Sequence, residues 1–280
     1  MIPTTPTAPE LRDLAERIAH EGAHLAREMQ LGGIDVADTK TSAVDVVTEA
    51  DRAVEALIRS RLTETRPDDA ILGEEGDDLP GTSGVRWVVD PIDGTVNYLY
   101  GLPDCAVSVA AEINGEVVAG VVVTIPTGVT YAAALGHGAT RDGQPIGVRP
   151  SPPLAERLVL TGFGYRKVVR EHQAACIAAL LPEVRDIRRL GSCALDLCHV
   201  AEGGGDAYVE AGPQAWDFAA GGLVLCEAGG RFDLLEGSLA LEGHSARNVV
   251  VGTPATGWDD FVAALGAAGF LGEAPGGAGE

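Results

Sequence analysis

Six acidic side chains stand at the ends of apolar segments, where a folded chain could gather them. They are Asp51 in "VTEAD", Glu74 and Glu75 in "ILGEEG", Asp90 and Asp93 in "DPIDGT", and Asp217 in "AWDFAAG". Carboxylates brought into one region repel each other unless they are protonated or bridged by divalent cations. Oxygen ligands without His or Cys beside them favour Mg²⁺ or Ca²⁺ over Zn²⁺. Mg²⁺ bound by a few carboxylates and a phosphate is an arrangement for phosphoryl transfer.

Most of these acidic motifs also have a purely structural explanation. Thr48 and Asp51 have the spacing of a capping box, and Asp217 is placed to be the N-cap of a following helix. The segment "GEEGDD" has the composition of a solvated loop. Any one motif can therefore be structural, whereas several acidic motifs in one chain favour metal binding.

The segment "DPIDGT" allows two interpretations. Asp-Gly between apolar runs is a hairpin signal, and Pro fits the first turn position. Alternatively, the chain ends a buried strand at Asp90, and Gly94 and Thr95 open a short helix whose free N–H groups face an anion. The other acidic motifs favour the second interpretation.

Apolar spacing predicts the elements that position the first three motifs. One helix has Leu11, Leu14, Ile18, Leu25 and Met29 on one face, and a second helix begins near Thr48 with Val54, Ile58 and Leu62 on its inner face. Strands then run into the acidic loop at 74–75 and into Asp90. From 105 to 134, three β-rich runs joined by Asn114-Gly115 and by Pro126 to Gly128 predict an antiparallel meander.

Strands and helices alternate in the rest of the chain. Strands are predicted in "RLVLTGF", "VRDIRRL", "DAYVEA" and "RFDLL", with helices near 167–181, 193–203 and 217–228. The pattern breaks at "GVRPSPP". We therefore expect a mixed α/β protein with two layered halves, 1–150 and 151–270, and a disordered tail over 271–280.

The composition limits the class of partner. The chain has 280 residues, is 46% hydrophobic and carries a formal net charge of −21. This charge argues against nucleic acid or an anionic membrane as a partner, because both need a surplus of Lys and Arg. An anionic substrate would need metal ions to screen it.

Cysteine usage and the N-terminus favour a cytoplasmic protein. There are five cysteines with no C-x-x-C pair, which we interpret as buried thiols in a reducing compartment. The first residues lack the basic start and apolar run of a signal peptide. His20 and His24 have metal-ligand spacing, but two exposed histidines are the favoured interpretation.

Four motifs together resemble those of the inositol monophosphatase family of Mg²⁺-dependent, lithium-sensitive phosphatases. They are "VVTEAD", "ILGEEG", "DPIDGTVNY" and "AWDFAAGGLVLCEAGG", and they occur in this order within residues 10 to 268. "TGFGYRK" resembles the bacterial branch of the family. The resemblance implies a layered αβαβα sandwich of the inositol monophosphatase and sugar phosphatase type, a homodimer, and two to three Mg²⁺ ions at each site.

The resemblance also implies roles for the acidic residues. The first metal would be bound by Glu74, Asp90 and the carbonyl group of Ile92, and the second by Asp90, Asp93 and Asp217, with Glu74 near a third, weaker site. Thr95 and Glu74 would orient the attacking water, and Asp51 would accept a hydrogen bond from Thr95.

Further roles concern the substrate. The amides of Gly94 and Thr95 would hold phosphate oxygens, and Glu210 would accept hydrogen bonds from ring hydroxyls. The segment Gly191, Ser192, Cys193 and Ala194 would face the ring through its backbone, and Lys40 would lie in a mobile loop that helps to close the site. A surface glutamate at a strand end is the structural alternative for Glu210.

The predicted activity is hydrolysis of inositol 1-phosphate to myo-inositol and phosphate by metal-activated water. A related phosphatase is the alternative, acting on fructose 1,6-bisphosphate, histidinol phosphate or a 3′-phosphonucleotide. A substrate with two phosphates would need a basic pocket, and the sequence indicates no Arg or Lys cluster near Glu210. A different class of function is a protein-binding regulator that uses the same surface, against which the intact acidic motifs argue.

Overall fold

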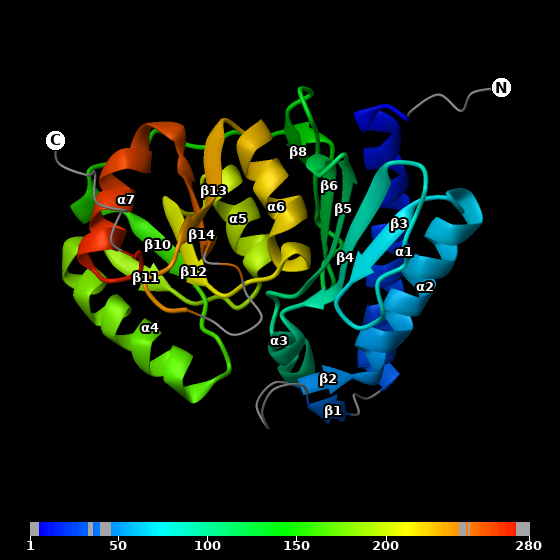
Figure 1. The fold of residues 1–280 in the computed structure, drawn as a ribbon, viewed down its shortest axis with the longest axis horizontal. Helices are drawn as coiled ribbons and strands as arrows, with labels where there is room; N and C mark the ends of the chain where they lie inside the picture. Colours follow the sequence, from blue (N-terminus) through cyan, green and yellow to red (C-terminus); the bar gives the residue numbers. More distant parts are fainter. Residues whose placement is uncertain (1–5, 33–35, 40–45, 241–244, 246, 273–280) are drawn as a thin grey trace, which may run out of the picture.

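Five layers of secondary structure follow one another across the molecule (Figure 1). The computed structural model describes the chain except for residues 1–5, 33–35, 40–45, 241–244, 246 and 273–280. The layers are helices α4 (Lys167–Leu180) and α7 (Trp258–Ala267), a five-stranded sheet, helices α5 (Cys193–Ala201) and α6 (Ala215–Glu227), a seven-stranded sheet, and helices α1 (Ala8–Gly32) and α2 (Glu49–Thr65). The predicted mixed α/β fold of αβαβα type is confirmed.

The seven-stranded sheet has the strand order β3-β4-β5-β6-β7-β8-β9. Its strands are β3 Ala70–Gly73, β4 Val85–Asp93, β5 Ala106–Ile113, β6 Glu116–Thr124, β7 Thr130–Ala134, β8 Ala139–Arg141 and β9 Gln144–Pro145. Only β3 and β4 pair in parallel among these strands. Strands β5 to β7 are the predicted meander, and Asn114 and Gly115 turn between β5 and β6 with φ of 54° and 85°. The sequence patterns do not predict β8 and β9.

Three helices and a small hairpin accompany this sheet. They are α1 Ala8–Gly32, α2 Glu49–Thr65 and α3 Thr95–Tyr100, with β1 Val36–Thr39 antiparallel to β2 Val46–Thr48. Thr48 is the N-cap of α2 and forms the predicted capping box with Asp51. The helix start therefore lies where the sequence predicts it.

The five-stranded sheet has the order β11-β10-β12-β14-β13. Its strands are β10 Leu158–Thr161, β11 Asp186–Arg188, β12 Ala207–Ala211, β13 Gly230–Glu236 and β14 Arg247–Pro254. The helices around it are α4 Lys167–Leu180, α5 Cys193–Ala201, α6 Ala215–Glu227 and α7 Trp258–Ala267. Three single 3₁₀ turns are η1 Leu154–Glu156, η2 Leu181–Glu183 and η3 Ala255–Gly257. The predicted alternation is confirmed as far as β13, whereas β14 and α7 are not predicted. The division into two halves near residue 150 stays a prediction.

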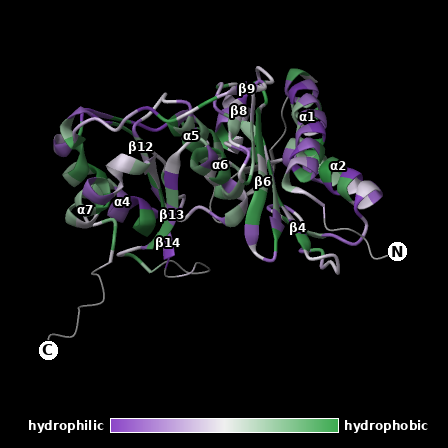
Figure 2. Cartoon of the chain, turned by 90° about the horizontal axis from the view of Figure 1, so that it is seen from above, coloured by the Kyte–Doolittle hydropathy of each residue, from purple (hydrophilic) through white to green (hydrophobic). Residues whose placement is uncertain are grey.

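Helix α6 is buried between the two sheets and carries Asp217 at its start. Its middle consists of small residues, and Gly120 of β6 packs directly against it. A Cβ atom on Gly120 would lie 2.8 Å from the carbonyl oxygen of Ala220. Figure 2 shows hydrophobic residues along β4 and β6, in the sheet that lies between α6 and the helices α1 and α2. The core therefore fixes where α6 begins.

Two smaller predictions are wrong in part. Cys105, Cys176, Cys193 and Cys198 are buried, but Cys226, in the last turn of α6, is exposed. The tail predicted as disordered from residue 271 begins with two ordered residues, because Leu271 bridges Gly237 and the N–H of Gly272 donates to the Glu236 carbonyl at 3.0 Å. Residues 273–280 lie outside the described residues. Among the described helices, none combines the length and apolar character needed to cross a membrane.

Candidate active site

The edge of the seven-stranded sheet brings Glu74 and Asp90 together. In the parallel pair β3 and β4, Leu72 lies opposite Val88 and Gly73 lies opposite Val89. The next residues in this register are Glu74 and Asp90, whose side chains share a hydrogen bond. Two motifs that are separate in the sequence thus meet where parallel strands end.

A β-bulge places Asp90 and Asp93 on the same face of β4. Asp90 pairs with Ser108 and Asp93 pairs with Ala106, so three steps along β4 match two steps along β5. In a regular strand, residues three apart point to opposite faces. The extra residue of the bulge removes this difference. "DPIDGT" is therefore a bulged strand end followed by α3, and the hairpin interpretation is wrong.

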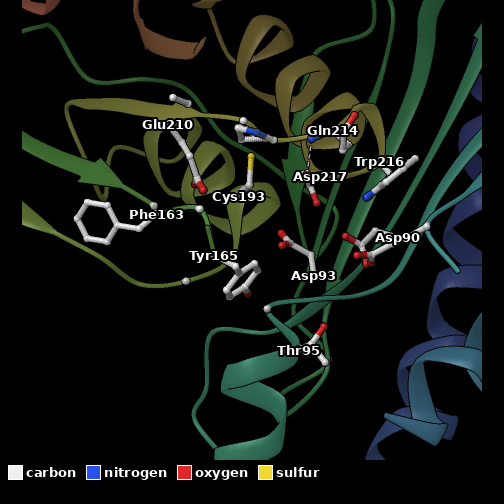
Figure 3. Close-up of a pocket in the computed structure, with 18 of the residues that line it drawn as sticks. Asp90, Asp93, Thr95, Phe163, Tyr165, Cys193, Glu210, Gln214, Trp216 and Asp217 are labelled. Atoms are coloured by element: carbon white, nitrogen blue, oxygen red, sulfur yellow. Dashed lines mark hydrogen bonds between the residues drawn. The ribbon is translucent and has the colours of Figure 1, made fainter. Parts of the chain in front are cut away.

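Asp90, Asp93 and Asp217 converge on one point (Figure 3). One carboxylate oxygen from each lies within 4.8 Å of the others. Burial raises the pKa of all three groups, that of Asp93 to about 6. Nearby carboxylates, including Glu74, raise the pKa of Asp90 and Asp217 further. Such a set stays ionised at neutral pH when positive charge compensates it, and oxygen ligands alone suit a hard divalent cation. The donor set therefore fits a metal site.

The start of α5 holds Asp93. Asp93 Oδ2 accepts hydrogen bonds from the Ser192 hydroxyl at 2.6 Å and from the Ala194 N–H at 2.7 Å. Ser192 is also the N-cap of α5, since its hydroxyl accepts from the Leu195 N–H at 3.2 Å. These bonds favour the ionised carboxylate and oppose the effect of burial on the pKa of Asp93.

Thr95 lies between Asp51 and Ile92. Its hydroxyl is 3.2 Å from Asp51 Oδ1 and 3.1 Å from the Ile92 carbonyl oxygen. Asp51 Oδ2 accepts from the N–H and the hydroxyl of Thr48, at 2.8 and 2.5 Å. Burial raises the pKa of Asp51 although these bonds oppose the rise. Asp51 therefore serves both in the capping box and as a hydrogen-bond partner of Thr95.

Asp217 lies at the third position of α6, so its predicted place at the N-cap is wrong. Gln214 is the N-cap, and its N–H donates to Asp217 Oδ2 at 2.5 Å. The Ser108 hydroxyl donates to the Trp216 carbonyl at 3.2 Å and fastens the helix start to β5. The capping box fixes the direction of the Asp217 carboxylate toward the other two aspartates.

A cavity of about 720 Å³ opens in front of the aspartates. Its acidic end is lined by the three aspartates and by four further residues, Glu74, Ile92, Gly94 and Thr95. Phe163, Tyr165 and Glu210 lie on the other side of the cavity from Asp90 (Figure 3). The space therefore connects the candidate metal site with side chains of the five-stranded sheet and its loops.

Glu210 faces this cavity, so the surface alternative is wrong. Its Oε2 accepts a hydrogen bond from the Tyr208 hydroxyl at 2.6 Å. Burial raises the pKa of Glu210 to about 7. A Cβ atom on Gly162 would collide with the Glu210 carboxylate, so the absence of a side chain at Gly162 leaves room for it. Tyr208 was missed in the sequence, although residues two apart on a strand share a face.

Two arginines line the same cavity, which corrects the prediction of no cationic cluster near Glu210. Arg166 and Arg189 both belong to the lining. The charge of Arg189 opposes the rise in the pKa of Glu210. Arg189 directly follows β11 and Arg166 precedes α4 after β10, so the sequence places them 23 residues apart, whereas β10 and β11 pair in parallel.

The remaining predicted residues divide into four groups. Gly94, Gly191 and Cys193 line the cavity. Ser192 and Ala194, predicted to face the substrate, use their hydroxyl and N–H to hold Asp93. Lys40 lies outside the described residues. His20 and His24 are both exposed, as predicted.

Comparisons with known proteins agree with this geometry. A sequence model of the inositol monophosphatase family matches residues 10–265. The inositol-1-monophosphatase SuhB of Mycobacterium tuberculosis is 43% identical over 273 residues, 91% of this chain and 93% of that protein. The Nus factor SuhB of Xylella fastidiosa is 43% identical over 190 residues, 68% of this chain and 69% of that protein. The solved structure of M. tuberculosis SuhB has a TM-score of 0.80 at 41% identity, covering 95% of this chain and 99% of that chain. The chain belongs to the inositol monophosphatase family.

Proposed function

We propose that the protein is a Mg²⁺-dependent phosphate monoester hydrolase that converts inositol 1-phosphate to myo-inositol and phosphate. The observation that carries this proposal is the convergence of Asp90, Asp93 and Asp217 within 4.8 Å. Their position at one end of a cavity of about 720 Å³ leaves room for a substrate beside them. The M. tuberculosis relative is named an inositol-1-monophosphatase, which supports the choice of substrate.

Glu74, Asp90, the Ile92 carbonyl, Asp93 and Asp217 would bind two to three Mg²⁺ ions. If bound there, Mg²⁺ would lower the pKa of a water molecule and would neutralise developing charge on the leaving oxygen. Attack is direct and in line, so the water oxygen bonds to phosphorus as the ester P–O bond breaks, with no phosphoenzyme.

Thr95 would orient the attacking water together with Glu74. The Thr95 hydroxyl can give its one hydrogen to Asp51 or to the Ile92 carbonyl. Its oxygen lone pairs then remain to accept a hydrogen from the water, while Glu74 accepts the other. Asp51 is a positioning residue in this scheme, because its contact with the reaction passes through Thr95.

The substrate would extend from the acidic end toward Glu210. The amides of Gly94 and Thr95 would bind phosphate oxygens, and the Glu210 carboxylate would accept hydrogen bonds from ring hydroxyls. Tyr208 would hold that carboxylate in place. The backbone at Gly191 and Cys193 would face the ring, and the closing role of Lys40 stays a prediction. Family resemblance leads us to propose in addition a lithium-sensitive, cytoplasmic homodimer.

Arg166 and Arg189 favour a second candidate, a phosphatase for a substrate with two anionic groups. Both arginines line the cavity that contains Glu210. A cation there could bind a second phosphate while the first lies at the aspartates. The Xylella fastidiosa relative is named a Nus factor, so a regulatory role through protein binding is a further alternative.

An assay of purified protein separates these candidates. Phosphate release is measured from inositol 1-phosphate, fructose 1,6-bisphosphate, histidinol phosphate, a 3′-phosphonucleotide and glycerol 2-phosphate, each with Mg²⁺ and with a chelator. We expect the highest kcat/KM for inositol 1-phosphate and no turnover in chelator. A preference for a bisphosphate would favour the second candidate, and no Mg²⁺-dependent turnover on any ester would contradict the proposed function.

A further inference from the structure

A glutamate of α2 binds the acidic loop that follows β3. Glu55 is 2% exposed. Its Oε2 accepts the N–H of Glu75 at 2.7 Å, and its Oε1 accepts the N–H of Gly76 at 2.8 Å. Arg59, one turn further along α2, donates its Nε–H to the same Oε1 at 2.7 Å. Helix α2 runs beside the pair β3 and β4 (Figure 1), so a side chain of the outer layer reaches the edge of the sheet.

The loop "GEEG" is shaped around this carboxylate. Arg59 Nη2 donates to the Gly76 carbonyl at 3.2 Å, so the ion pair binds a donor and an acceptor of the same residue. A Cβ atom on Gly73 would lie 2.5 Å from Glu55 Oε1, and one on Gly76 would lie 2.8 Å from it. The glycines on both sides of Glu74 and Glu75 are therefore needed because Glu55 occupies the space beside them.

The contact of Glu55 with the loop restricts the position of Glu74, which lies between Gly73 and Glu75. Gly73 is the last residue of β3 and pairs with Val89, and Glu75 is bound through its N–H to Glu55. Glu74 thus has both peptide neighbours fixed, and its side chain shares a hydrogen bond with Asp90. A buried carboxylate is costly to keep unless donors compensate it, and here two of the donors are backbone groups of the loop.

We propose that Glu55 is a positioning residue of the metal site, which sets the place of Glu74 beside Asp90 without itself reaching the metal. This inference rests on the proposed function, because it assumes that Glu74 is a metal ligand. Residues that orient the ligands of a metal change its affinity when they are altered, usually by about 10- to 100-fold.

The test is the Mg²⁺ affinity of Glu55→Gln, measured by titration calorimetry on the full chain. Glutamine keeps the size of the side chain but removes the charge and one acceptor, so one loop N–H or Arg59 loses its partner. We expect a dissociation constant raised by about 10- to 100-fold. Turnover at saturating Mg²⁺ should fall much less than turnover at low Mg²⁺, because the ligand itself is intact.

Glu112→Gln is the matched control. Glu112 is 7% exposed on β5 and accepts from Arg86 Nε at 2.6 Å, so it is also a buried glutamate paired with an arginine. Among the described residues, the Glu112 carboxylate forms no hydrogen bond with the loop that contains Glu74. Both variants should lower the melting temperature in chelator, but Glu112→Gln should bind Mg²⁺ as the wild type does.

A second variant covers the case in which Glu55→Gln fails to fold. Gly76→Ala lies on the exposed side of the loop and would displace the Glu55 carboxylate from outside, so it should weaken Mg²⁺ binding in the same direction. Wild-type Mg²⁺ affinity in both variants would overturn the positioning role while leaving the proposed function intact. Failure of the wild type to bind Mg²⁺ would overturn the proposed function and, with it, this inference.

Discussion

Ser192 donates its hydroxyl to Asp93 Oδ2 at 2.6 Å, and this bond joins the end of β4 to the start of α5. Asp93 belongs to the seven-stranded sheet, and Ser192 belongs to the central helix layer beneath the five-stranded sheet. The third aspartate of the cluster, Asp217, lies in the first turn of α6, the other central helix. The candidate metal site therefore forms only where the layers pack, and no single motif contains it.

Ser192→Ala should weaken metal binding more than it unfolds the protein. The variant removes the hydroxyl that donates to Asp93 and leaves the hydrogen bonds from the backbone of Ala194 and Cys193. Loss of the N-cap should cost about 0.5–2 kcal/mol of stability. The Mg²⁺ dissociation constant from calorimetry should rise by about 10-fold or more. Ser192→Thr retains a hydroxyl at the N-cap and should recover much of the affinity; equal weakening in both variants would contradict this role.

Asp93→Asn should lower kcat by several orders of magnitude without unfolding the protein. The substitution removes a ligand charge from the second proposed metal. In chelator the variant should be as stable as the wild type or more stable, because the remaining buried carboxylates repel each other less. The measurement pairs steady-state kinetics in Mg²⁺ with thermal unfolding in chelator. Near wild-type turnover would contradict the assignment of Asp93 as a ligand.

Stability without metal should fall as the pH rises. Burial raises the pKa of Asp93 from 3.8 to about 6, and it also raises the pKa of Asp90 and Asp217. The folded state therefore binds protons more tightly than the unfolded chain, so this contribution is complete below the unfolded pKa and is lost as the pH rises through about 6. The melting temperature of chelated protein should decrease from about pH 4 to pH 6 as Asp93 ionises, and should continue to decrease above pH 6 as Asp90 and Asp217 ionise.

Mg²⁺ should reverse that trend, because it binds the ionised carboxylates. Binding to the folded state alone stabilises by about 2.7 kcal/mol at 100 times the dissociation constant. The rise in melting temperature on adding Mg²⁺ to chelated protein should thus be larger at neutral pH than at acid pH. If millimolar Mg²⁺ does not change the melting temperature at neutral pH, the carboxylates have a structural role only.

The acidic residues could be predicted because each lies in a short motif at the end of an apolar run. What the sequence did not indicate depends on contacts between distant elements. The bulge that aligns Asp90 with Asp93 depends on pairing with β5. In the sequence, Glu55 is one of several charged residues of an amphipathic helix. Only the fold shows that it lies beside Gly73 and Gly76. Likewise, Arg166 and Arg189 follow strands whose pairing no local pattern specifies.

The N-cap preferences of the residues also predicted the wrong start for helix α6. Asp is a strong N-cap and Gln a weak one, so the sequence favours Asp217 as the N-cap of the helix. The structure instead uses Gln214 as the N-cap and Asp217 at the third helical position, where its carboxylate accepts the Gln214 N–H. The same residue type can cap from either position. The helix thus starts three residues earlier than predicted, and its capping box holds the Asp217 carboxylate within the cluster of aspartates.

Glu210→Gln distinguishes an inositol phosphatase from a phosphatase in general. The Tyr208 hydroxyl holds the Glu210 carboxylate at the far side of the cavity from Asp90. If Glu210 accepts hydrogen bonds from ring hydroxyls, the variant should lower kcat/KM for inositol 1-phosphate by the equivalent of about 1–3 kcal/mol. Glycerol 2-phosphate is too small to reach from the aspartates to Glu210 in the same way, and its kcat/KM should fall much less. Equal losses on both substrates would mean that Glu210 supports the fold or the metal site, and the choice of inositol 1-phosphate would then lose its structural support.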